Sequence, residues 1–306
     1  MPNSARPMLT IQGASEATGV PATTLRAWES RYGIARARRT DAGYRVYDDD
    51  ALAEIRRMQE YLKAGAAPRL AADAVIRTRT AAADTSAERA SGQPASDGAA
   101  TPPGLPPVHD LLDAAGALDE RRLAEILDLA FSTASFELVL DRWLFPALRE
   151  VGLAWERGTL DVSAEHLASA AVMRRLSALY DAAPLVPSAP RVLVGLPPGS
   201  EHEIPPLAFA IAGRRAGLGT VYLGPNLPTD SWVTAARNPE VRAVVISVRT
   251  PDDLDAAAEV ARAVAKVRPD VKIGIGGPAA GPVDPQSLTL SGSVPESARM
   301  LASLLQ

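Results

Sequence analysis

The chain has 306 residues, of which 47% are hydrophobic and none is cysteine, which excludes disulfides, iron–sulfur clusters and thiolate zinc sites. No apolar run reaches the length of a membrane span and the first eight residues do not look like a secretory signal, so we expect a cytoplasmic protein without a membrane partner. The net charge is −4, but residues 1–79 hold 13 Lys and Arg against 9 Asp and Glu, and this basic head suggests a surface for nucleic acid.

The basic head predicts a winged helix-turn-helix. A helix over 11–19 and a second helix over 22–33 flank a short turn, and the spacing places Leu25 and Trp28 of the second helix in the core. A basic, hairpin-like wing follows over 35–47. The side chains expected to contact base edges or phosphates are Thr23, Thr24, Arg26, Arg31, Arg36, Arg38, Arg39, Tyr44 and Arg45.

The runs LRAWESRYG at 25–33 and RRTDAGYRVYDDDALAEI at 38–55 resemble the helix, wing and third helix of the MerR family. The resemblance covers about 70 residues and implies a double-stranded DNA operator as partner. A single small head makes few phosphate contacts, so we also expect a homo-oligomer, a dimer or a tetramer. The alternative interpretation of these residues is a small helical domain with a solvated basic face.

The rest of the chain predicts three further parts after the head at 1–79. Residues 80–107 are rich in Ala, Ser, Gly and Pro and predict a flexible linker. Leucine-rich helical periodicity over 108–183 predicts a four-helix bundle. Strands alternate with helices in 184–306, which predicts a doubly wound, Rossmann-like parallel sheet and makes the fold class multidomain α and α/β. The expected strands are 191–195, 220–224, 241–247 and 271–277, with helices over 206–216, 229–236 and 252–267.

Two of the three histidines lie where a ligand site is plausible. His202 follows the first strand of the sheet directly, and ligands of doubly wound sheets bind beyond the carboxyl ends of the strands. Trp155 precedes the pair Glu165-His166 in the bundle. Spacing alone favours a simpler interpretation, in which Trp155 belongs to the bundle core, Glu165-His166 is an exposed pair and His202 is an incidental loop residue.

Head, bundle and sheet together resemble the CarH/LitR group of cobalamin-dependent, light-responsive repressors, over nearly the whole chain. The resemblance implies adenosylcobalamin as cofactor, capped by Trp155, Glu165 and His166, with His202 as the lower axial metal ligand. It implies no catalytic residues. The residues that correspond to the loops lining the nucleotide tail are Ser247, Gly276 and Gly277.

The sequence departs from the family pattern at four positions. Ser200 and Pro205 replace the acid and the glycine of the motif around His202, Arg249 stands where such folds often keep a small or apolar residue, and Glu156 replaces a histidine that captures cobalt after photolysis.

Three functions therefore stay open. The first is a repressor gated by adenosylcobalamin, with light as a possible signal. The second keeps the DNA-binding role, but its degenerate pocket takes a bilin or another pigment, or only a protein partner. The third is a corrinoid carrier for methyl transfer or a mutase subunit, which is disfavoured because 306 residues leave no room for a catalytic barrel.

Overall fold

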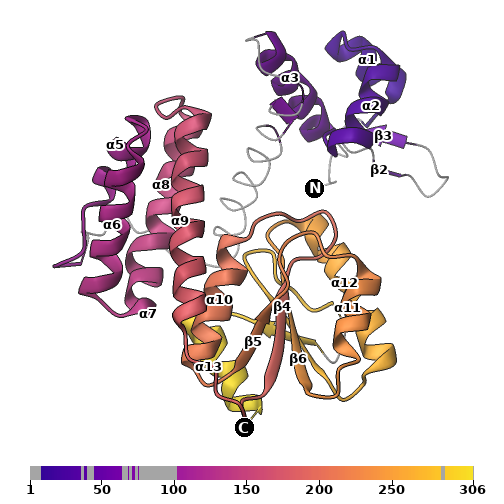
Figure 1. Cartoon of the computed structure of the whole chain (residues 1–306). Helices are drawn as coiled ribbons and strands as arrows, with labels where there is room; N and C mark the ends of the chain where they lie inside the picture. The colour runs from indigo at the N-terminus through magenta and orange to yellow at the C-terminus, as the bar shows by residue number, and fades with distance from the viewer. Residues whose placement is uncertain are drawn as a thin grey trace, which may run out of the picture. The chain divides into compact units, whose positions relative to one another are not determined.

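The computed structural model describes residues 8–35, 38–39, 45–63, 68, 71–72, 75, 102–283 and 287–305, with the backbone alone for residues 30, 31, 38, 39, 45 and 252. The chain divides into two compact units, Met1–Ala83 (unit 1) and Asp84–Gln306 (unit 2), and each is described by itself (Figure 1). Among the described residues, no helix combines the length and the apolar character that crossing a bilayer requires.

Unit 1 is a helix-turn-helix joined to a small antiparallel sheet and a third helix. The elements are β1 (Leu9–Thr10), α1 (Ile11–Thr18), α2 (Ala22–Tyr32), β2 (Arg38–Arg39), β3 (Arg45–Tyr47) and α3 (Asp49–Lys63). Strand β3 lies between β1 and β2. The sequence predicts the two helices and the wing, whereas β1 is a new element because two residues leave no periodic pattern.

The core of unit 1 holds the helices on the sheet. Leu25 and Trp28 are 0% and 8% exposed, which confirms that this face of α2 is buried. They belong to a cluster with Ile34, Tyr47 and Ile55, contributed by the turn after α2, by β3 and by α3. Burying this apolar face leaves the opposite face of α2 to solvent.

Unit 2 begins with the four-helix bundle that the sequence predicts. Its elements are α5 (Val108–Gly116), α6 (Glu120–Thr133), α7 (Phe136–Val139), the π-helical turn η1 (Leu140–Leu144), α8 (Phe145–Glu156) and α9 (Val162–Ala182). Helices α7 and α8 run on through η1, so they form one of the four helices. Trp143 in η1 is fully buried and its Nε1 donates to the carbonyl of Pro106 at 2.6 Å. Pro106 therefore contacts the bundle, and Leu105 belongs to the core of the bundle. Both residues stand at the end of the predicted linker.

Two leucines of the leucine-rich segment are exposed. Leu129 and Leu138 are 50% and 42% exposed. In α6 the buried positions are Leu123, Ile126 and Leu127, which follow the spacing of one helical face, and residue 129 lies off that face.

The second half of unit 2 is a five-stranded sheet whose neighbouring strands are all parallel, in the order β5-β4-β6-β7-β8. The elements are β4 (Arg191–Gly195), α10 (Ile204–Arg215), β5 (Gly219–Tyr222), α11 (Thr229–Ala236), β6 (Val241–Ser247), α12 (Pro251–Val267), β7 (Lys272–Gly276), β8 (Ser287–Leu290) and α13 (Val294–Leu305). The sequence predicts β4 to β7 and α10 to α12. It does not predict β8, which has four residues and two hydroxyl side chains, or α13.

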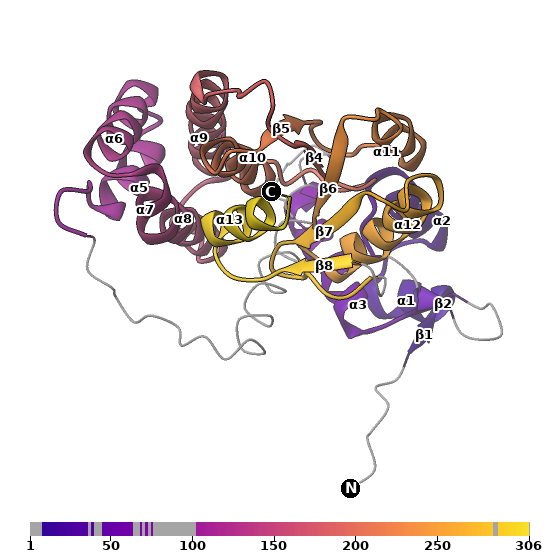
Figure 2. The same ribbon diagram turned by 90° about the horizontal axis from the view of Figure 1, so that it is seen from below.

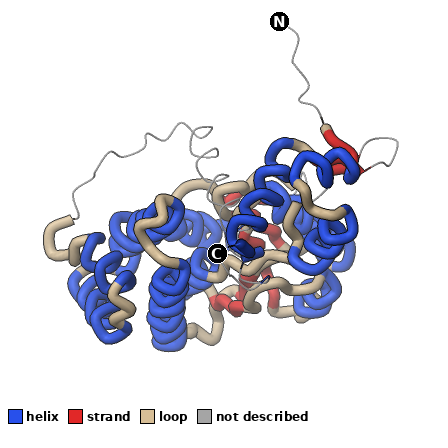
Figure 3. Tube along the Cα trace, turned by 90° about the horizontal axis from the view of Figure 1, so that it is seen from above, coloured by secondary structure: helices blue, strands red, loops and turns tan. Residues whose placement is uncertain are grey.

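Alternate residues of the strands enter two different cores. Val192 and Val194 pack in a core shared with α10, α13 and the bundle, whereas Leu193 packs with α11 and α12. Figure 2 shows α10 and α13 on one face of the sheet and α11 and α12 on the other. Both faces are covered, which is why the strands read as continuous apolar runs. Figure 3 shows how helices surround the strands of this sheet.

Helix α9 of the bundle is fastened to the sheet. The hydroxyl of Tyr180 donates to the carbonyl of Thr220 at 2.9 Å and accepts from the N–H of Tyr222 at 3.0 Å, so the end of α9 lies against edge strand β5. The guanidinium of Arg214 lies 3.5 Å from the centre of the Tyr180 ring and donates to the Tyr180 carbonyl. An ion pair between Arg215 and Glu137 joins α10 to α7 at 2.7 Å. These contacts make bundle and sheet one body.

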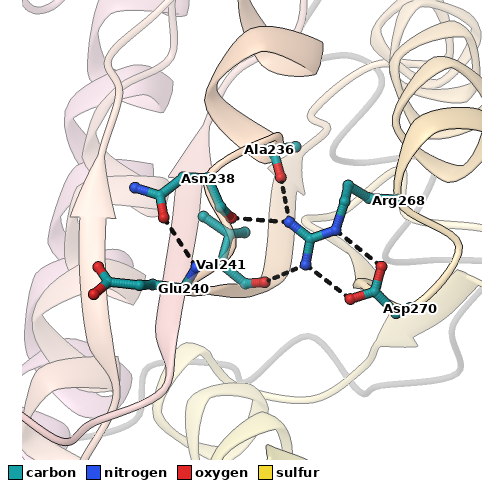
Figure 4. A network of polar contacts seen from close by, with 6 residues as sticks. All are labelled: Ala236, Asn238, Glu240, Val241, Arg268 and Asp270. Atoms are coloured by element: carbon teal, nitrogen blue, oxygen red, sulfur yellow. Dashed lines mark hydrogen bonds and ion pairs between the residues drawn. The ribbon is translucent and has the colours of Figure 1, made fainter.

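At the opposite face of the sheet, Arg268 joins the end of α12 to the start of β6 (Figure 4). Its guanidinium donates to the carbonyls of Ala236, Asn238 and Val241 at 2.7, 2.8 and 3.1 Å. The Asp270 carboxylate accepts from the same guanidinium at 2.9 and 2.8 Å. This hydrogen bonding from Arg268 lowers the pKa of Asp270 to about 2.

Candidate functional site

The strand order of the sheet locates the candidate site. The chain leaves β4 through α10 on one face of the sheet and returns to β6 through α11 on the other, so the topological switch point lies between β4 and β6. Ligands bind at the carboxyl ends of the strands at such a point. His202 follows β4 in the loop before α10, and Ser247 is the last residue of β6. Both are partly buried.

The loop that carries His202 is held by the loop after β5. The N–H of Gly199 donates to Asn226 Oδ1 at 2.7 Å, and the N–H of Asn226 donates to the carbonyl of Ser200 at 2.8 Å. The hydroxyl of Tyr222 donates to Glu203 Oε2 at 3.0 Å. Burial, and next the Glu203 carboxylate, raise the pKa of Tyr222 above its ordinary value, so this phenol stays protonated and donates.

Of the two departures in the motif around His202, the structure explains Pro205 but not Ser200. Pro205 lies in the first turn of α10, where a helix has no intrahelical partner for the N–H that proline lacks. Ser200 is 2% exposed, and its hydroxyl has no hydrogen-bond partner within the described part of the chain. The carboxylate of Glu203, the residue after His202, accepts from the hydroxyl of Tyr222.

Ser247, Gly276 and Gly277 are brought together at the carboxyl ends of β6 and β7. Ser247 pairs with Gly276 in the sheet, and the N–H of Val248 donates to the Gly276 carbonyl at 2.7 Å. Gly277 has a φ of +115°, and a Cβ there would lie 2.0 Å from the carbonyl oxygen of Val248. Packing of these two loops is therefore sufficient to require glycine at 277. The N–H of Arg249 donates to the carboxylate of Asp253 at 3.0 Å, next to the capping box that Thr250 and Asp253 form at the start of α12.

The three predicted cap residues lie at one end of the bundle. Trp155 is near the end of α8 and half-buried, and Glu165 and His166 are in the first turn of α9. The Glu165 carboxylate contacts His166 Nδ1 at 3.0 Å and accepts from Ser169 Oγ at 2.8 Å. The His166 side chain is 48% exposed. A carboxylate at Nδ1 orients the ring and leaves Nε2 facing other partners. Glu156, the fourth departure, is exposed beside Trp155.

The cap end of the bundle and the carboxyl edge of the sheet lie on the same side of unit 2. Helix α9 ends shortly before β4 begins and runs in the opposite direction, and Figure 1 shows it extending beyond the sheet. Tyr180 contacts β5 near the carboxyl end of that strand. From there to Glu165 the helix rises about 22 Å, so the cap residues stand well beyond the end of β5.

The ligands that this edge of the sheet offers are suited to a metal ion that a macrocycle already coordinates. Among the described residues, no group of three or more His, Cys, Asp or Glu could hold a metal ion. A corrin supplies four nitrogens to cobalt and needs one ligand from a protein, which the imidazole of His202 can provide. Gly199 and Gly224, on the loops after β4 and β5, have open space where a side chain would stand. The residues at this edge therefore fit a corrinoid, although the motif around His202 is incomplete.

In unit 1 the structure places part of the predicted DNA surface. Thr23 and Arg26 are exposed on α2, and Thr24 is partly buried. Arg38, Arg39 and Arg45 lie in β2 and β3, but their side chains, and that of Arg31, lie outside the described residues. Arg36 and Tyr44 lie outside them altogether. A residue that sequence reasoning missed is Glu54 of α3, which is 7% exposed and accepts from the N–H of Ala35 at 2.7 Å.

Fold and site together define a DNA-binding regulator of the MerR type that carries a B12-binding module. Family models match in the corresponding order: MerR HTH family regulatory protein at residues 9–74, and B12 binding domains at residues 108–180 and 190–292. The cofactor class that these domains support is cobalamin.

The chain belongs to the family of transcription regulators that includes two repressors of Myxococcus xanthus. It is 33% identical to the HTH-type transcriptional repressor CarH over 80% of this chain and 81% of that protein. It is 30% identical to the HTH-type transcriptional repressor CarA over 88% of this chain and 87% of that protein. The monomethylamine corrinoid protein of Methanosarcina barkeri shares the fold, with a TM-score of 0.53 at 15% identity over 64% of this chain and 98% of that one. The two repressors and the MerR match favour a regulator over the enzymatic alternative.

Proposed function

We propose that this protein is a transcriptional repressor whose DNA binding is controlled by adenosylcobalamin, with light as the signal. The observation that carries the proposal is the position of His202, on a fastened loop at the switch point of the sheet and on the same side of unit 2 as the cap. His202 would provide the imidazole that binds cobalt, and Trp155, Glu165 and His166 would contact the adenosyl group. Ser247, Gly276 and Gly277 line the nucleotide tail.

The cap residues have separate tasks in this proposal. Adenosylcobalamin supplies a weak cobalt–carbon bond that light breaks. Trp155 shields the adenosyl side from water, and the Glu165 carboxylate, held by Ser169, orients His166 toward the hydroxyl and amino groups of that ligand. Because these residues sit at the junction of α8 and α9, loss of the adenosyl group removes contacts that hold this end of the bundle. The bundle end then shifts and changes the oligomer that presents the heads to DNA.

The cofactor is tested by absorbance titration with adenosylcobalamin in the dark. The wild type should bind it with the spectrum of a histidine-ligated corrinoid, and His202→Ala should bind at least about tenfold more weakly or keep the spectrum of the free cofactor. His109→Ala is the matched control, because His109 is 75% exposed at the start of α5, away from the site. Absence of uptake by the wild type would refute the cobalamin proposal.

The DNA-binding side is tested on a fragment of the protein's own promoter. Arg26→Ala should weaken binding and, if Arg26 contacts a phosphate, reduce the dependence on salt by about one unit of slope. Arg121→Ala removes the same charge from an exposed ion pair of the bundle and should leave binding unchanged. Illumination of the cofactor-loaded protein should release the DNA and alter the sedimentation of the oligomer. Equal DNA binding in the dark and in the light would refute the role of the protein as a photoreceptor, but not its role as a transcription regulator.

A further inference from the structure

The loop that carries His202 is fastened on both sides of the histidine, by Tyr222 of β5 and by Asn226 in the loop after β5. On the amino side, Asn226 forms two hydrogen bonds with consecutive residues of the loop, Gly199 and Ser200. On the carboxyl side, Tyr222 donates to Glu203, the residue next to His202. Within the loop, the N–H of Ser200 donates to the carbonyl of Pro197 and the N–H of Glu203 donates to the carbonyl of Glu201, which form two short turns.

The backbone at Asn226 shows why this residue type occupies the position. Its φ is +50°, in the left-handed region that non-glycine residues rarely adopt and asparagine tolerates best together with aspartate. This conformation turns the N–H of Asn226 toward the Ser200 carbonyl while its side-chain oxygen accepts from Gly199. Glycine would provide the conformation without the acceptor, and alanine would provide neither. Aspartate would provide both.

We propose that Asn226 and Tyr222 are positioning residues that hold His202 where its imidazole can bind cobalt, an inference that rests on the cobalamin site proposed above. A histidine ligand is usually oriented by a partner on its own ring, and the acid that would do this is replaced here by Ser200. In this chain, contacts on either side of His202 hold the loop that carries it. Ordering the loop beforehand spares the conformational entropy that binding would otherwise cost.

The test is a matched series at one position, Asn226→Asp, Asn226→Gly and Asn226→Ala, in the full chain. The probe is cob(II)alamin bound to protein labelled with nitrogen-15, observed by electron paramagnetic resonance. A protein imidazole on cobalt splits the signal into doublets, whereas the nitrogen-14 of the cofactor's own base gives triplets. Melting temperatures of the ligand-free variants show which of them fold.

We expect doublets in the wild type and in Asn226→Asp, with similar affinities. Asn226→Gly and Asn226→Ala should lose most of the doublet signal and bind about 10-fold more weakly, in the range seen when the support of a metal ligand is removed. Tyr222→Phe, which keeps the ring and loses the donor to Glu203, should have a smaller effect in the same direction. Doublets and wild-type affinity in Asn226→Gly would overturn the proposal, because the glycine keeps the backbone and lacks the acceptor.

Two further outcomes separate this inference from the proposed function. If the wild type takes up no cobalamin, the proposed function fails; if it binds with triplets, ligation by His202 fails, and either result overturns this role for Asn226. The fastening itself is measured without cofactor, as amide exchange of Gly199. Exchange should be faster in Asn226→Gly and near the wild-type rate in Asn226→Asp. Equal rates in all variants would show that Asn226 does not hold the loop.

Discussion

Glu54→Ala tests how unit 1 holds the entry to its wing. The Glu54 carboxylate accepts from the N–H of Ala35 at 2.7 Å, and Ala35 is 0% exposed with a φ of +53°. Removing the carboxylate leaves a buried N–H unpaired at a turn that strains a non-glycine residue. A hydrogen bond to a charged group contributes about 1.5–3 kcal/mol, so we expect Glu54→Ala to lower the free energy of local opening of this turn by about 2 kcal/mol. Ala35 lies between α2 and β2, so the loosened turn should also weaken DNA binding.

The measurement is residue-resolved amide exchange at Ala35 together with anisotropy of a labelled promoter fragment. A loss of about 2 kcal/mol corresponds to roughly 30-fold faster exchange. Glu54→Gln retains an acceptor and should recover part of the protection. Glu60→Ala is the control, because Glu60 is exposed on the same helix. The reasoning is wrong if Glu54→Ala leaves both exchange at Ala35 and DNA affinity at the wild-type values.

Three further predictions concern unit 2. Asp270→Asn should lower the melting temperature at pH 7, and this difference from the wild type should disappear as the pH falls from about 4 toward 2. The pKa of Asp270 is lowered to about 2, so the stabilisation by its carboxylate is complete above this window and is lost within it. A constant difference in melting temperature across the window would contradict the ion pair with Arg268. Gly277→Ala should lower the free energy of unfolding by at least about 2 kcal/mol, since its Cβ would meet the Val248 carbonyl oxygen. Gly276→Ala is the control, because its Cβ would have Leu290 as its nearest neighbour, at 3.7 Å. Equal losses in the two variants would argue against the close approach at Gly277. Trp143→Phe should cost about 1 kcal/mol or more by leaving the Pro106 carbonyl without its donor, and an unchanged denaturation midpoint would show that this contact contributes nothing.

Local patterns in the sequence were sufficient for most of the architecture. Helical periodicity identifies the bundle, apolar runs identify β4 to β7, and the position of His202 directly after a strand places it at the carboxyl edge of the sheet, because every strand of a parallel sheet presents its carboxyl end there. The same patterns do not predict β1, which has only two residues, or β8, in which Ser287 and Thr289 interrupt the apolar run. Nor does leucine content say which side of α6 residue 129 occupies.

Tertiary structure alone decided which residues support the site. Asn226 lies 24 residues beyond His202 in the chain, and they come together because β5 pairs with β4 and their loops leave the sheet side by side. Glu54 meets Ala35 for a similar reason, 19 residues apart, once α3 has packed on the turn after α2. Sequence determines which chemistry is available at a position and which local conformation it favours. Partners distant along the chain follow from the packing of whole elements, because hydrogen-bond geometry depends on positions in space that no local pattern contains.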